Sequence, residues 1–483
     1  MARQGKPERM ERLLKPDICV IGAGSGGLTV AAAAAAFGVS VVLVERARMG
    51  GDCLNHGCVP SKAMIASAKL AERIRHASEF GLGKLQPEID FAAVNRHVQG
   101  VIDAIAPNDS VERFTALGVR VIQAEARFID KRTVVAGDAQ IRARRFVIAT
   151  GSSPNVPPIP GLDEVPYLTN ETIFARKRLT RRLLVVGGGP VGLELAQAHR
   201  RLGAEVTVIE ADAILSREDP ELAALLRRRL VDEGIDIREG VKVTRIEKRG
   251  NLVRAHLDHA GETGTVDGSH VLLATGRKPN LEGLGLEAAD IRHSPSGIAG
   301  DSRLRTSNRR VYAIGDVLGG TQFTHLASFH AGIALRNILF RLRARADRTA
   351  IPRVTFTDPE IAHMGMSEAE ARASHRRLRI LRWPYAENDR AQAERRTEGL
   401  IKLVADRRGR VLGVSIAGAD AGEQMAFWSL VVARRMRVHD IAGLVLPYPT
   451  MSEIGKRAAV AYFSEATRKP IVRRIIRFLR MFG

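Results

Sequence analysis

Apolar and glycine-rich segments follow the same order at two places along the chain. The first reads DICVIGAGSGGLTVAAAAAAFGVSVVLVER, with a short apolar run at Ile18–Ile21, a glycine turn, an alanine-rich run near Thr29–Phe37 and a second apolar run that ends at Glu45. The second reads RLLVVGGGPVGLELAQAHRRLGAEVTVIEA and ends at Glu210. Short apolar runs bounded by turn signals are typical of buried strands, and longer runs are typical of helices. Each segment therefore predicts a strand, a glycine turn, a helix and a second strand.

The remaining pattern predicts how the chain divides into domains. The segment PSKAMIASAKLAERIRHA, with Pro60 near its start, predicts a further helix. The proline-rich stretch Gly151–Thr180 predicts a linker. The segments LIKLVAD and VLGVSIAG, which follow IPRVTFTDPEIAHMGMSEAEAR, predict strands of a last α+β domain. We expect five parts, which span residues 1–154, 155–275, 276–348, 349–465 and 466–483.

Composition narrows the classes of protein to consider. A length of 483 residues predicts about three domains. The formal net charge of +21 could indicate nucleic acid or a membrane as partner, but the arginines are spread along the chain and aromatic residues make up only 5%. We therefore expect no nucleic-acid partner. The chain has no run of about 18 apolar residues, the length that a transmembrane helix needs. The N-terminus lacks the apolar core of a secretory signal. We therefore expect a cytoplasmic protein.

The two glycine turns carry a pattern that suits a dinucleotide. Such a turn uses its first glycine for a tight bend, its second for close approach to a pyrophosphate and its third for close packing of the helix. The helix N-terminus then offers unpaired N–H groups to the phosphates, and an acidic residue accepts hydrogen bonds from the ribose. The spacing from first glycine to acid is 23 residues in both turns. The residues concerned are Gly22, Gly24, Gly27 and Glu45 in the first turn, and Gly187, Gly189, Gly192 and Glu210 in the second.

Two such turns in one chain predict two bound dinucleotides. A flavin dinucleotide and a nicotinamide dinucleotide are the expected pair. At the second turn Glu210 is a carboxylate where NADP would require a cation for its 2′-phosphate, which predicts NADH in preference to NADPH.

Two of the three cysteines lie in the segment GGDCLNHGCVPSKA, at Cys53 and Cys58. In a regular helix their Cα atoms would be about 8–9 Å apart, farther than the roughly 4.4–6.8 Å of a disulfide, so the pair needs a distorted turn or a loop entering a helix. A zinc half-site or two unreactive thiols are the alternatives, but the chain has no second cysteine pair to complete a zinc site. We favour a redox-active pair and no metal site. Cys19, inside the first apolar run, is expected to be buried.

Several motifs together resemble those of the class I pyridine nucleotide–disulfide oxidoreductases, which include dihydrolipoamide dehydrogenase and mercuric reductase. The resemblance extends from about Asp17 to about Phe463. It implies an α/β fold with two Rossmann-like dinucleotide-binding domains, for FAD and NAD, plus a C-terminal α+β dimerisation domain, and hence a homodimer. The motifs are the two glycine turns, GGDCLNHGCVPSKA, ATG at Ala149–Gly151, ATGRKPN at Ala274–Asn280, AIGDV at Ala313–Val317 and PYPTMSE.

The resemblance also implies roles for matching positions. Electrons would pass from NADH to FAD and on to a Cys53–Cys58 disulfide, with Cys58 as the charge-transfer thiolate nearest the flavin and Cys53 as the thiol that attacks substrate. Lys62 and Glu194 would form an ion pair beside the flavin ring. Further contacts to the cofactors would come from Gly51, Lys62, Thr150, Gly151, Asp316 and Gly276.

The C-terminal motif departs from the pattern of many relatives. They carry a histidine, oriented by a glutamate, as acid–base for the substrate-attacking thiol; here the glutamate is Glu453 and the histidine is replaced by Tyr448. An unperturbed tyrosine titrates near 10 and is a poor base at neutral pH. Tyrosine at this place looks like mercuric reductase, yet the chain ends RRIIRFLRMFG without the cysteine pair with which that group ends.

Three functions therefore stay open. The first is NADH-dependent reduction of a disulfide, dithiol-type or thiophilic substrate; the second is reduction of Hg(II); the third is a redox-sensing or membrane-associated flavoprotein without turnover. The tail bears on the third, because apolar residues at 471, 472, 475, 476 and 479 share one helical face beside several arginines. A basic amphipathic helix of this kind can contact the inner face of a membrane or dock on its own domain.

Overall fold

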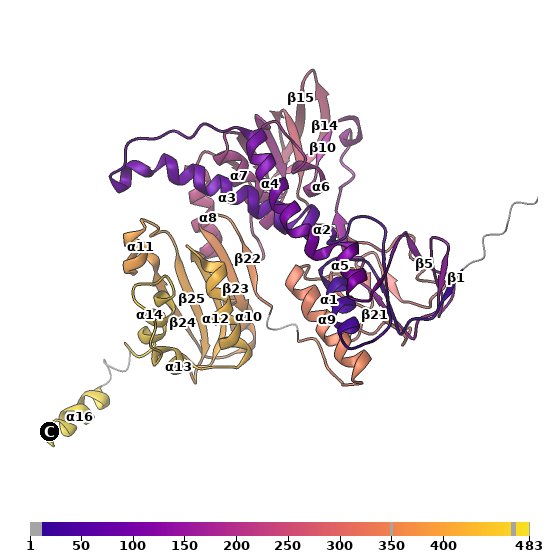
Figure 1. The fold of residues 1–483 in the computed structure, drawn as a ribbon. Helices are drawn as coiled ribbons and strands as arrows, with labels where there is room; N and C mark the ends of the chain where they lie inside the picture. Colours follow the sequence, from indigo (N-terminus) through magenta and orange to yellow (C-terminus); the bar gives the residue numbers. More distant parts are fainter. Residues whose placement is uncertain (1–11, 348–350, 465–469, 483) are drawn as a thin grey trace, which may run out of the picture.

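The computed structural model describes residues 12–347, 351–464 and 470–482 (Figure 1). Residues 1–11, 348–350, 465–469 and 483, which fall in the parts expected at 1–154, 276–348, 349–465 and 466–483, lie outside the described residues.

A five-stranded parallel sheet, in the order β21-β8-β2-β3-β4, forms the core of the first domain. Every residue of β2, including Cys19, is buried, as expected for a continuous apolar run in a parallel sheet. Because β21 comes from beyond the second glycine turn, the chain leaves this sheet and returns to it. The strands are β2 (Ile18–Ile21), β3 (Val41–Glu45), β4 (Arg120–Gln123), β8 (Arg145–Ile148) and β21 (Val311–Ala313).

Helices and a smaller sheet complete this domain. Helices α1 and α9 pack together beside the parallel sheet, and α3 and α4 form a hairpin. The smaller sheet has the order β1-β7-β6-β5. The helices are α1 (Ser25–Ala36), α2 (Gly51–Asn55), α3 (Cys58–Arg75), α4 (Phe91–Ile105), α5 (Val111–Ala116) and α9 (Thr324–Leu339); the strands are β1 (Arg12–Leu14), β5 (Ala126–Phe128), β6 (Val134–Ala136) and β7 (Ala139–Ile141).

A second five-stranded parallel sheet, β10-β17-β11-β12-β13, carries the second glycine turn. The stretch predicted as a linker contributes β10 to its edge and β9 (Ser152–Pro154) to a pair with β18 (Arg277–Pro279), so it connects the sheets and also extends one of them. A three-stranded antiparallel sheet of β14 (Lys242–Arg249), β15 (Leu252–His259) and β16 (Glu262–Gly268) lies beside it. The other elements are β10 (Tyr167–Leu168), α6 (Asn170–Ile173), β11 (Arg182–Val186), α7 (Pro190–Arg201), β12 (Glu205–Ile209), α8 (Pro220–Asp232), β13 (Asp236–Arg238) and β17 (His270–Leu273).

The C-terminal domain is an antiparallel sheet in the order β22-β23-β26-β25-β24 with helices packed against it. Its core contains the fully buried Trp428 of α12 and Tyr385. The predicted strands LIKLVAD and VLGVSIAG are β25 (Leu400–Asp406) and β26 (Val411–Gly418). The other elements are β22 (Arg353–Thr355), β23 (Glu360–Gly365), α10 (Glu368–Ser374), β24 (Leu378–Pro384), α11 (Asp389–Ala393), α12 (Ala421–Ala433), α13 (Val438–Ala442) and α14 (Glu453–Ala461).

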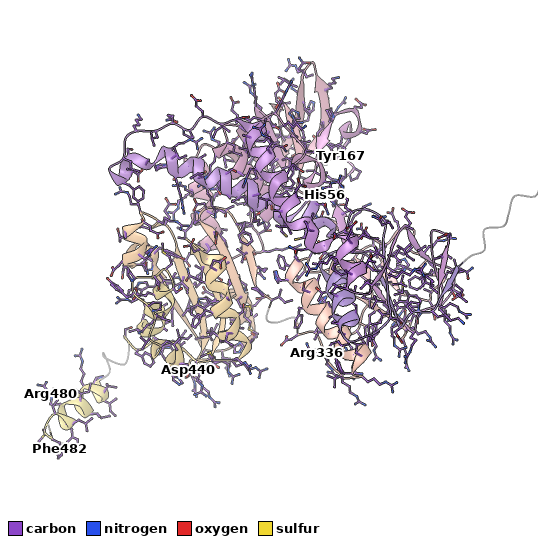
Figure 2. All side chains as sticks on the ribbon, viewed as in Figure 1. His56, Tyr167, Arg336, Asp440, Arg480 and Phe482 are labelled. Atoms are coloured by element: carbon purple, nitrogen blue, oxygen red, sulfur yellow. The ribbon has the colours of Figure 1, made fainter. Side chains whose placement is uncertain are left out.

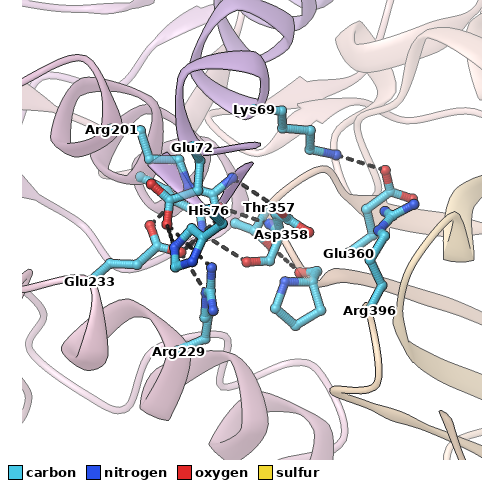
Figure 3. A network of polar contacts seen from close by, with 12 residues as sticks. Lys69, Glu72, His76, Arg201, Arg229, Glu233, Thr357, Asp358, Glu360 and Arg396 are labelled. Atoms are coloured by element: carbon cyan, nitrogen blue, oxygen red, sulfur yellow. Dashed lines mark hydrogen bonds and ion pairs between the residues drawn. The ribbon is translucent and has the colours of Figure 1, made fainter. Parts of the chain in front are cut away.

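A polar network fixes the C-terminal domain against α3 and α7 (Figure 3). Arg201, only 2% exposed, lies 2.6 Å from Glu233 and 2.9 Å from Asp358. Lys69 of α3 pairs with Glu360 of β23 at 3.0 Å. Removing one partner of such a buried pair leaves an uncompensated charge. The network therefore links the three domains through contacts that are costly to break.

The last described helix, α16 (Pro470–Leu479), contains no buried residue. Figure 1 shows it apart from the remaining elements, at the C-terminal end of the chain. Within the described residues, no helix combines the length and the apolar character that crossing a membrane requires.

Candidate functional site

The first glycine turn joins β2 to α1 through close backbone contacts. Gly22 has φ +103°, and a Cβ there would lie 2.4 Å from the carbonyl oxygen of Ala149. A Cβ on Gly27 would lie 1.9 Å from the carbonyl oxygen of Gly22. The Glu45 carboxylate accepts the Ala23 N–H at 2.6 Å and the Ala47 N–H at 2.8 Å. The turn therefore brings the N-terminus of α1 and a carboxylate to the same edge of the sheet.

The second turn repeats these contacts. Gly187 has φ +115°, and its Cβ would lie 2.4 Å from the carbonyl oxygen of Ala274. The Glu210 carboxylate accepts the Gly188 N–H at 2.6 Å and the Asp212 N–H at 3.0 Å. At the second turn, Ala274 and Gly276 occupy the positions equivalent to Ala149 and Gly151 at the first turn. Space is open at Gly189, where a Cβ would meet nothing within 4 Å, and a Cβ on Gly192 would lie 2.0 Å from the Gly187 carbonyl oxygen.

A cavity of about 770 Å³ opens at the first turn and reaches the cysteine pair. Its volume suits a large cofactor. Asp316 lies in its wall, and burial raises the pKa of this carboxyl. The sequence-predicted residues that line it are Gly22, Gly24, Glu45, Gly51, Cys53, Cys58, Thr150, Gly151 and Asp316. Three features of this cavity fit a flavin dinucleotide. They are the glycine backbone, a carboxylate that can accept hydrogen bonds from a ribose, and a second carboxyl group in the wall.

Cys53 and Cys58 lie on two different helices. Helix α2 ends at Asn55 and α3 begins at Cys58, so the helical backbone is interrupted at His56 and Gly57. This agrees with the expectation that the cysteine pair does not lie in one regular helix. The two thiols are free in this structure and share a hydrogen bond. That bond, and secondly the one with Thr324, lowers the pKa of Cys58 to about 6, against the opposing effect of burial. The same bond, with burial, raises the pKa of Cys53.

Thr324 was not identified from the sequence. Its hydroxyl lies 3.3 Å from the Cys58 sulfur, at the first residue of α9. A hydroxyl that donates to a thiolate stabilises the charged form. Only the return of the chain to the first sheet brings this residue to Cys58, 266 positions away. The sequence signal was its place shortly after the AIGDV motif.

Lys62 and Glu194 form the predicted ion pair, at 2.8 Å. The Glu194 side chain is 6% exposed, and its other oxygen accepts the Phe356 N–H at 2.9 Å. The Lys62 ammonium lies 4.4 Å from the centre of the Phe356 ring. These side chains do not line the cavity itself. The pair joins the helix of Cys58, the helix after the second turn and the start of the C-terminal domain.

A chain of polar contacts connects the cysteine segment to Asp316. Asp52 lies 3.1 Å from Arg277, whose Nε donates to the Ser152 hydroxyl at 2.8 Å. Ser152 in turn donates to Asp316 at 2.7 Å. The sequence identified Asp316 but assigned no role to Arg277, although it lies within the ATGRKPN motif. This chain of contacts holds Asp316 in the wall of the cavity.

Three histidines, His56, His325 and His330, make local contacts. His56, labelled in Figure 2, lies between Cys53 and Cys58 in the sequence, lines the cavity and accepts a hydrogen bond at its backbone oxygen from Asn170. His325 bonds the Pro352 oxygen at 3.0 Å, and His330 accepts the Gly315 N–H at 3.2 Å. The last two contacts give His325 and His330 local packing and capping roles.

Tyr448 and Glu453 lie far along the chain, on the C-terminal domain. Tyr448 is 68% exposed, and its hydroxyl donates to Asp389 at 2.8 Å, which raises the pKa of this tyrosine. Glu453 begins α14. All residues that line the cavity fall between Ile21 and Ala327, so the described part of one chain places no C-terminal residue there. Bringing Tyr448 to the cysteines would require a second subunit.

Two dinucleotide turns, one of them beside a pair of neighbouring thiols, define a class of redox protein: a nicotinamide- and flavin-dependent reductase that works through cysteines. The chain matches the family model "Pyridine nucleotide-disulphide oxidoreductase" over residues 16–331 and the model of that family's dimerisation domain over residues 351–459. The chain belongs to this family.

Named relatives agree with the family. The chain is 34% identical to a mercuric reductase of Bacillus cereus, covering 94% of this chain and 72% of that protein, and 35% identical to a mercuric reductase of Streptomyces lividans, covering 94% and 97%. It is 34% identical to a dihydrolipoyl dehydrogenase of Bacillus subtilis, covering 92% and 96%. Among solved structures, the Cu(II) complex of the HOCl-induced flavoprotein disulfide reductase RclA from Escherichia coli matches with a TM-score of 0.83 and 28% identity, covering 91% and 98%.

These similarities confirm the predicted fold class, with its two dinucleotide-binding domains and its dimerisation domain. The protein is an FAD-dependent oxidoreductase that uses a nicotinamide cofactor. The dimerisation domain supports a homodimer. The third possibility from the sequence, a flavoprotein without turnover, is therefore not favoured.

Proposed function

We propose that the protein passes two electrons from NADH, through FAD, to a Cys53–Cys58 disulfide and on to a substrate. The substrate is either a disulfide, the oxidised form of a dithiol-type substrate, or a thiophilic species. The observation that carries this proposal is the thiol pair in the cavity wall, in which Cys58 has a pKa of about 6. Bound FAD would supply two-electron transfer between the nicotinamide and the cysteines. The residues that would hold it line the cavity: Gly22, Gly24, Gly51, Thr150, Gly151 and Asp316. The resemblance further implies that the Lys62–Glu194 ion pair lies beside the flavin ring, outside the residues that line the cavity.

The thiols then transfer the electrons. With a disulfide substrate, Cys53 Sγ would bond to one substrate sulfur while the substrate S–S bond breaks, and the leaving sulfur takes a proton. Cys58 Sγ would next bond to Cys53 Sγ and release the second substrate thiol. The cysteine pair ends as a disulfide, oxidised by two electrons, and the substrate ends as two thiols.

The proton on Cys53 distinguishes the possible substrates. Its raised pKa keeps this thiol protonated, and Tyr448, with its own pKa raised by Asp389, is a poor base for it. A thiophilic cation needs no such base, because metal binding itself displaces the thiol proton. The Tyr448–Asp389 contact therefore favours a second candidate, reduction of a metal ion that binds thiolates, such as Hg(II) or Cu(II). The names of the mercuric reductases and of the RclA complex also suggest this candidate.

The deciding experiment is a screen of NADH oxidation by the holoenzyme. The acceptors are lipoamide, small disulfides, Hg(II), Cu(II), quinones and oxygen, each with the Cys53→Ser variant as control. Turnover of a disulfide or a metal ion that disappears in the variant supports the proposal. Turnover confined to quinones or oxygen and unchanged in Cys53→Ser refutes a role for the thiols.

Replacing Tyr448 by His tests the missing base. General acid–base catalysis contributes typically 10²–10⁴-fold, so Tyr448→His should raise lipoamide turnover by about 100-fold if the base limits the rate. Tyr448→Phe is the control, because it removes the hydroxyl that contacts Asp389 without supplying a base. Equal lipoamide rates in both variants would show that the substrate pocket limits turnover instead.

The preferred nicotinamide, the domain boundaries and the location of the protein are also proposals. We infer NADH in preference to NADPH from Glu210, since Arg201 is occupied by Glu233 and Asp358 and Arg200 by the Glu233 and Ala204 carbonyls. We place the domain boundaries as the sequence predicts them, and the protein in the cytoplasm.

A further inference from the structure

The C-terminal helix α16 separates apolar from cationic side chains. Ile471, Ile475, Ile476 and Leu479 recur at the spacing of one helical face, and each is 52–66% exposed. Arg474, Arg477 and Arg480 recur on the opposite side. Figure 2 shows Arg480 and Phe482 just beyond the C-terminal end of this helix, away from the remaining ribbon. The helix thus presents a large apolar face that the described residues of its own chain leave uncovered.

Charge distinguishes the occupants that could cover this face. Residues 466–483 contain six cations, Arg468, Lys469, Arg473, Arg474, Arg477 and Arg480, and no acidic residue. The chain carries +21 in total, so the other 465 residues carry +21 − 6 = +15. A second copy of this chain, or the rest of the same chain, would therefore meet the helix with charge of the same sign, which disfavours association.

An anionic surface with an apolar interior suits both faces. The negative headgroups of a bilayer attract a cluster of arginines, and its acyl region accepts isoleucine, leucine and phenylalanine side chains. Nucleic acid would satisfy the arginines only, because its phosphates offer nothing to the apolar face. The apolar face therefore favours lipid over nucleic acid.

We propose that α16 binds the surface of a bilayer that contains anionic phospholipid, with Ile471, Ile475, Ile476 and Leu479 inserted and the arginines at the headgroup phosphates. The helix is ten residues long and lies in the plane of the surface, since it is too short to span the bilayer. The reductase is thereby held at a membrane. This proposal does not depend on which substrate is reduced.

The test is co-sedimentation of the FAD-loaded full chain with vesicles. Phosphatidylcholine vesicles with added phosphatidylglycerol should pellet the protein, and pure phosphatidylcholine should pellet far less. Ile475→Asp/Ile476→Asp should abolish binding, because it places charge in the apolar face. Arg474→Gln/Arg477→Gln/Arg480→Gln should weaken binding on the order of 100-fold, at roughly fivefold for each cation near the surface.

A matched variant removes the same charge elsewhere. Arg309→Gln/Arg343→Gln/Arg345→Gln replaces three exposed arginines outside the tail and should change binding less than about threefold. Retained flavin absorbance and NADH oxidation in every variant show that the fold is intact. The proposal is overturned if Ile475→Asp/Ile476→Asp binds as wild type, if both arginine variants weaken binding equally, or if the isoleucine variant changes the oligomeric state and leaves vesicle binding unaltered.

Discussion

The two glycine turns share their backbone contacts and differ in what surrounds them. A Cβ on Gly22 or Gly187 would lie equally close to a carbonyl oxygen that follows a neighbouring strand. Each glutamate accepts two N–H groups at equivalent positions, from Ala23 and Ala47 for Glu45 and from Gly188 and Asp212 for Glu210. Only the first turn is followed by a second glycine pair, at Gly50–Gly51, on which α2 begins and presents Cys53 to the cavity. The same strand–turn–helix pattern therefore builds both dinucleotide sites. The segment that follows the first turn adds the cysteines, which make the first site reactive. We expect the first to retain FAD and the second to exchange its nicotinamide.

The largest effect should come from a methyl group in either turn. Gly22→Ala places a Cβ against the Ala149 oxygen in a backbone conformation that alanine disfavours, at a cost of about 2–5 kcal/mol. We expect protein without flavin colour. Gly187→Ala should remain yellow, while the rate of its reduction at low NADH concentration falls roughly 30- to 5,000-fold.

Gly38→Ala is the matched control for both. It shares the positive φ, but its Cβ would meet nothing within 4 Å, so it measures backbone strain alone. Flavin lost equally from the Gly22 and Gly187 variants would contradict the division of roles between the turns.

Removing the Cys58 thiol should make the site at the first turn as unreactive as the site at the second. Cys58→Ser eliminates the thiolate beside the cavity, so disulfide turnover should fall on the order of 1,000-fold or more. The long-wavelength absorbance of the reduced protein, which arises from charge transfer between this thiolate and the flavin, should vanish. Flavin should stay bound. Cys19→Ala, at a buried strand position that does not line the cavity, should leave both signals unchanged. Long-wavelength absorbance in Cys58→Ser would reverse the roles given to the two cysteines.

The Thr324 hydroxyl should set the pH range of that thiolate. With a pKa of about 6, Cys58 is charged above this pH and protonated below it, so the long-wavelength absorbance of the reduced holoenzyme should fall as the pH drops through about 6. Thr324→Val removes a hydrogen bond to the charged form and should move the midpoint upward by about one pH unit. Thr324→Ser keeps the hydroxyl and should restore the wild-type midpoint. An identical midpoint in the valine variant would deny Thr324 this positioning role.

The smallest effect should distinguish the two glutamates. Glu210→Gln removes a negative charge that opposes a 2′-phosphate, so the preference for NADH over NADPH should weaken by about five- to tenfold, read from kcat/KM. Glu45→Gln is the control, since it should weaken retention of flavin and leave the nicotinamide preference unchanged. A wild-type enzyme that uses NADPH more efficiently than NADH would refute the interpretation of Glu210.

Much of this site could be predicted because its parts are local in sequence. A glycine turn, its acid and the cysteine segment each lie within one strand–helix unit, where spacing alone determines which residues share an edge. Thr324 and Arg277 could not be predicted in this way. Thr324 reaches the cavity only when the chain returns to the first sheet, and Arg277 reaches it from β18, which pairs with β9. The Phe356 contacts to Glu194 and Lys62 likewise depend on how the third domain docks.

The sequence by itself determined the two dinucleotide turns, the cysteine pair and the family, since each rests on short-range spacing and on residue chemistry that no distant contact alters. Only the tertiary structure decided that the Cys58 thiol is the acidic one, because a thiol pKa depends on the hydrogen bonds and charges that Cys53, Thr324 and Lys62 supply within a few ångströms. It also decided that Tyr448 is held by Asp389, a contact between residues 59 positions apart that the motif alone does not contain.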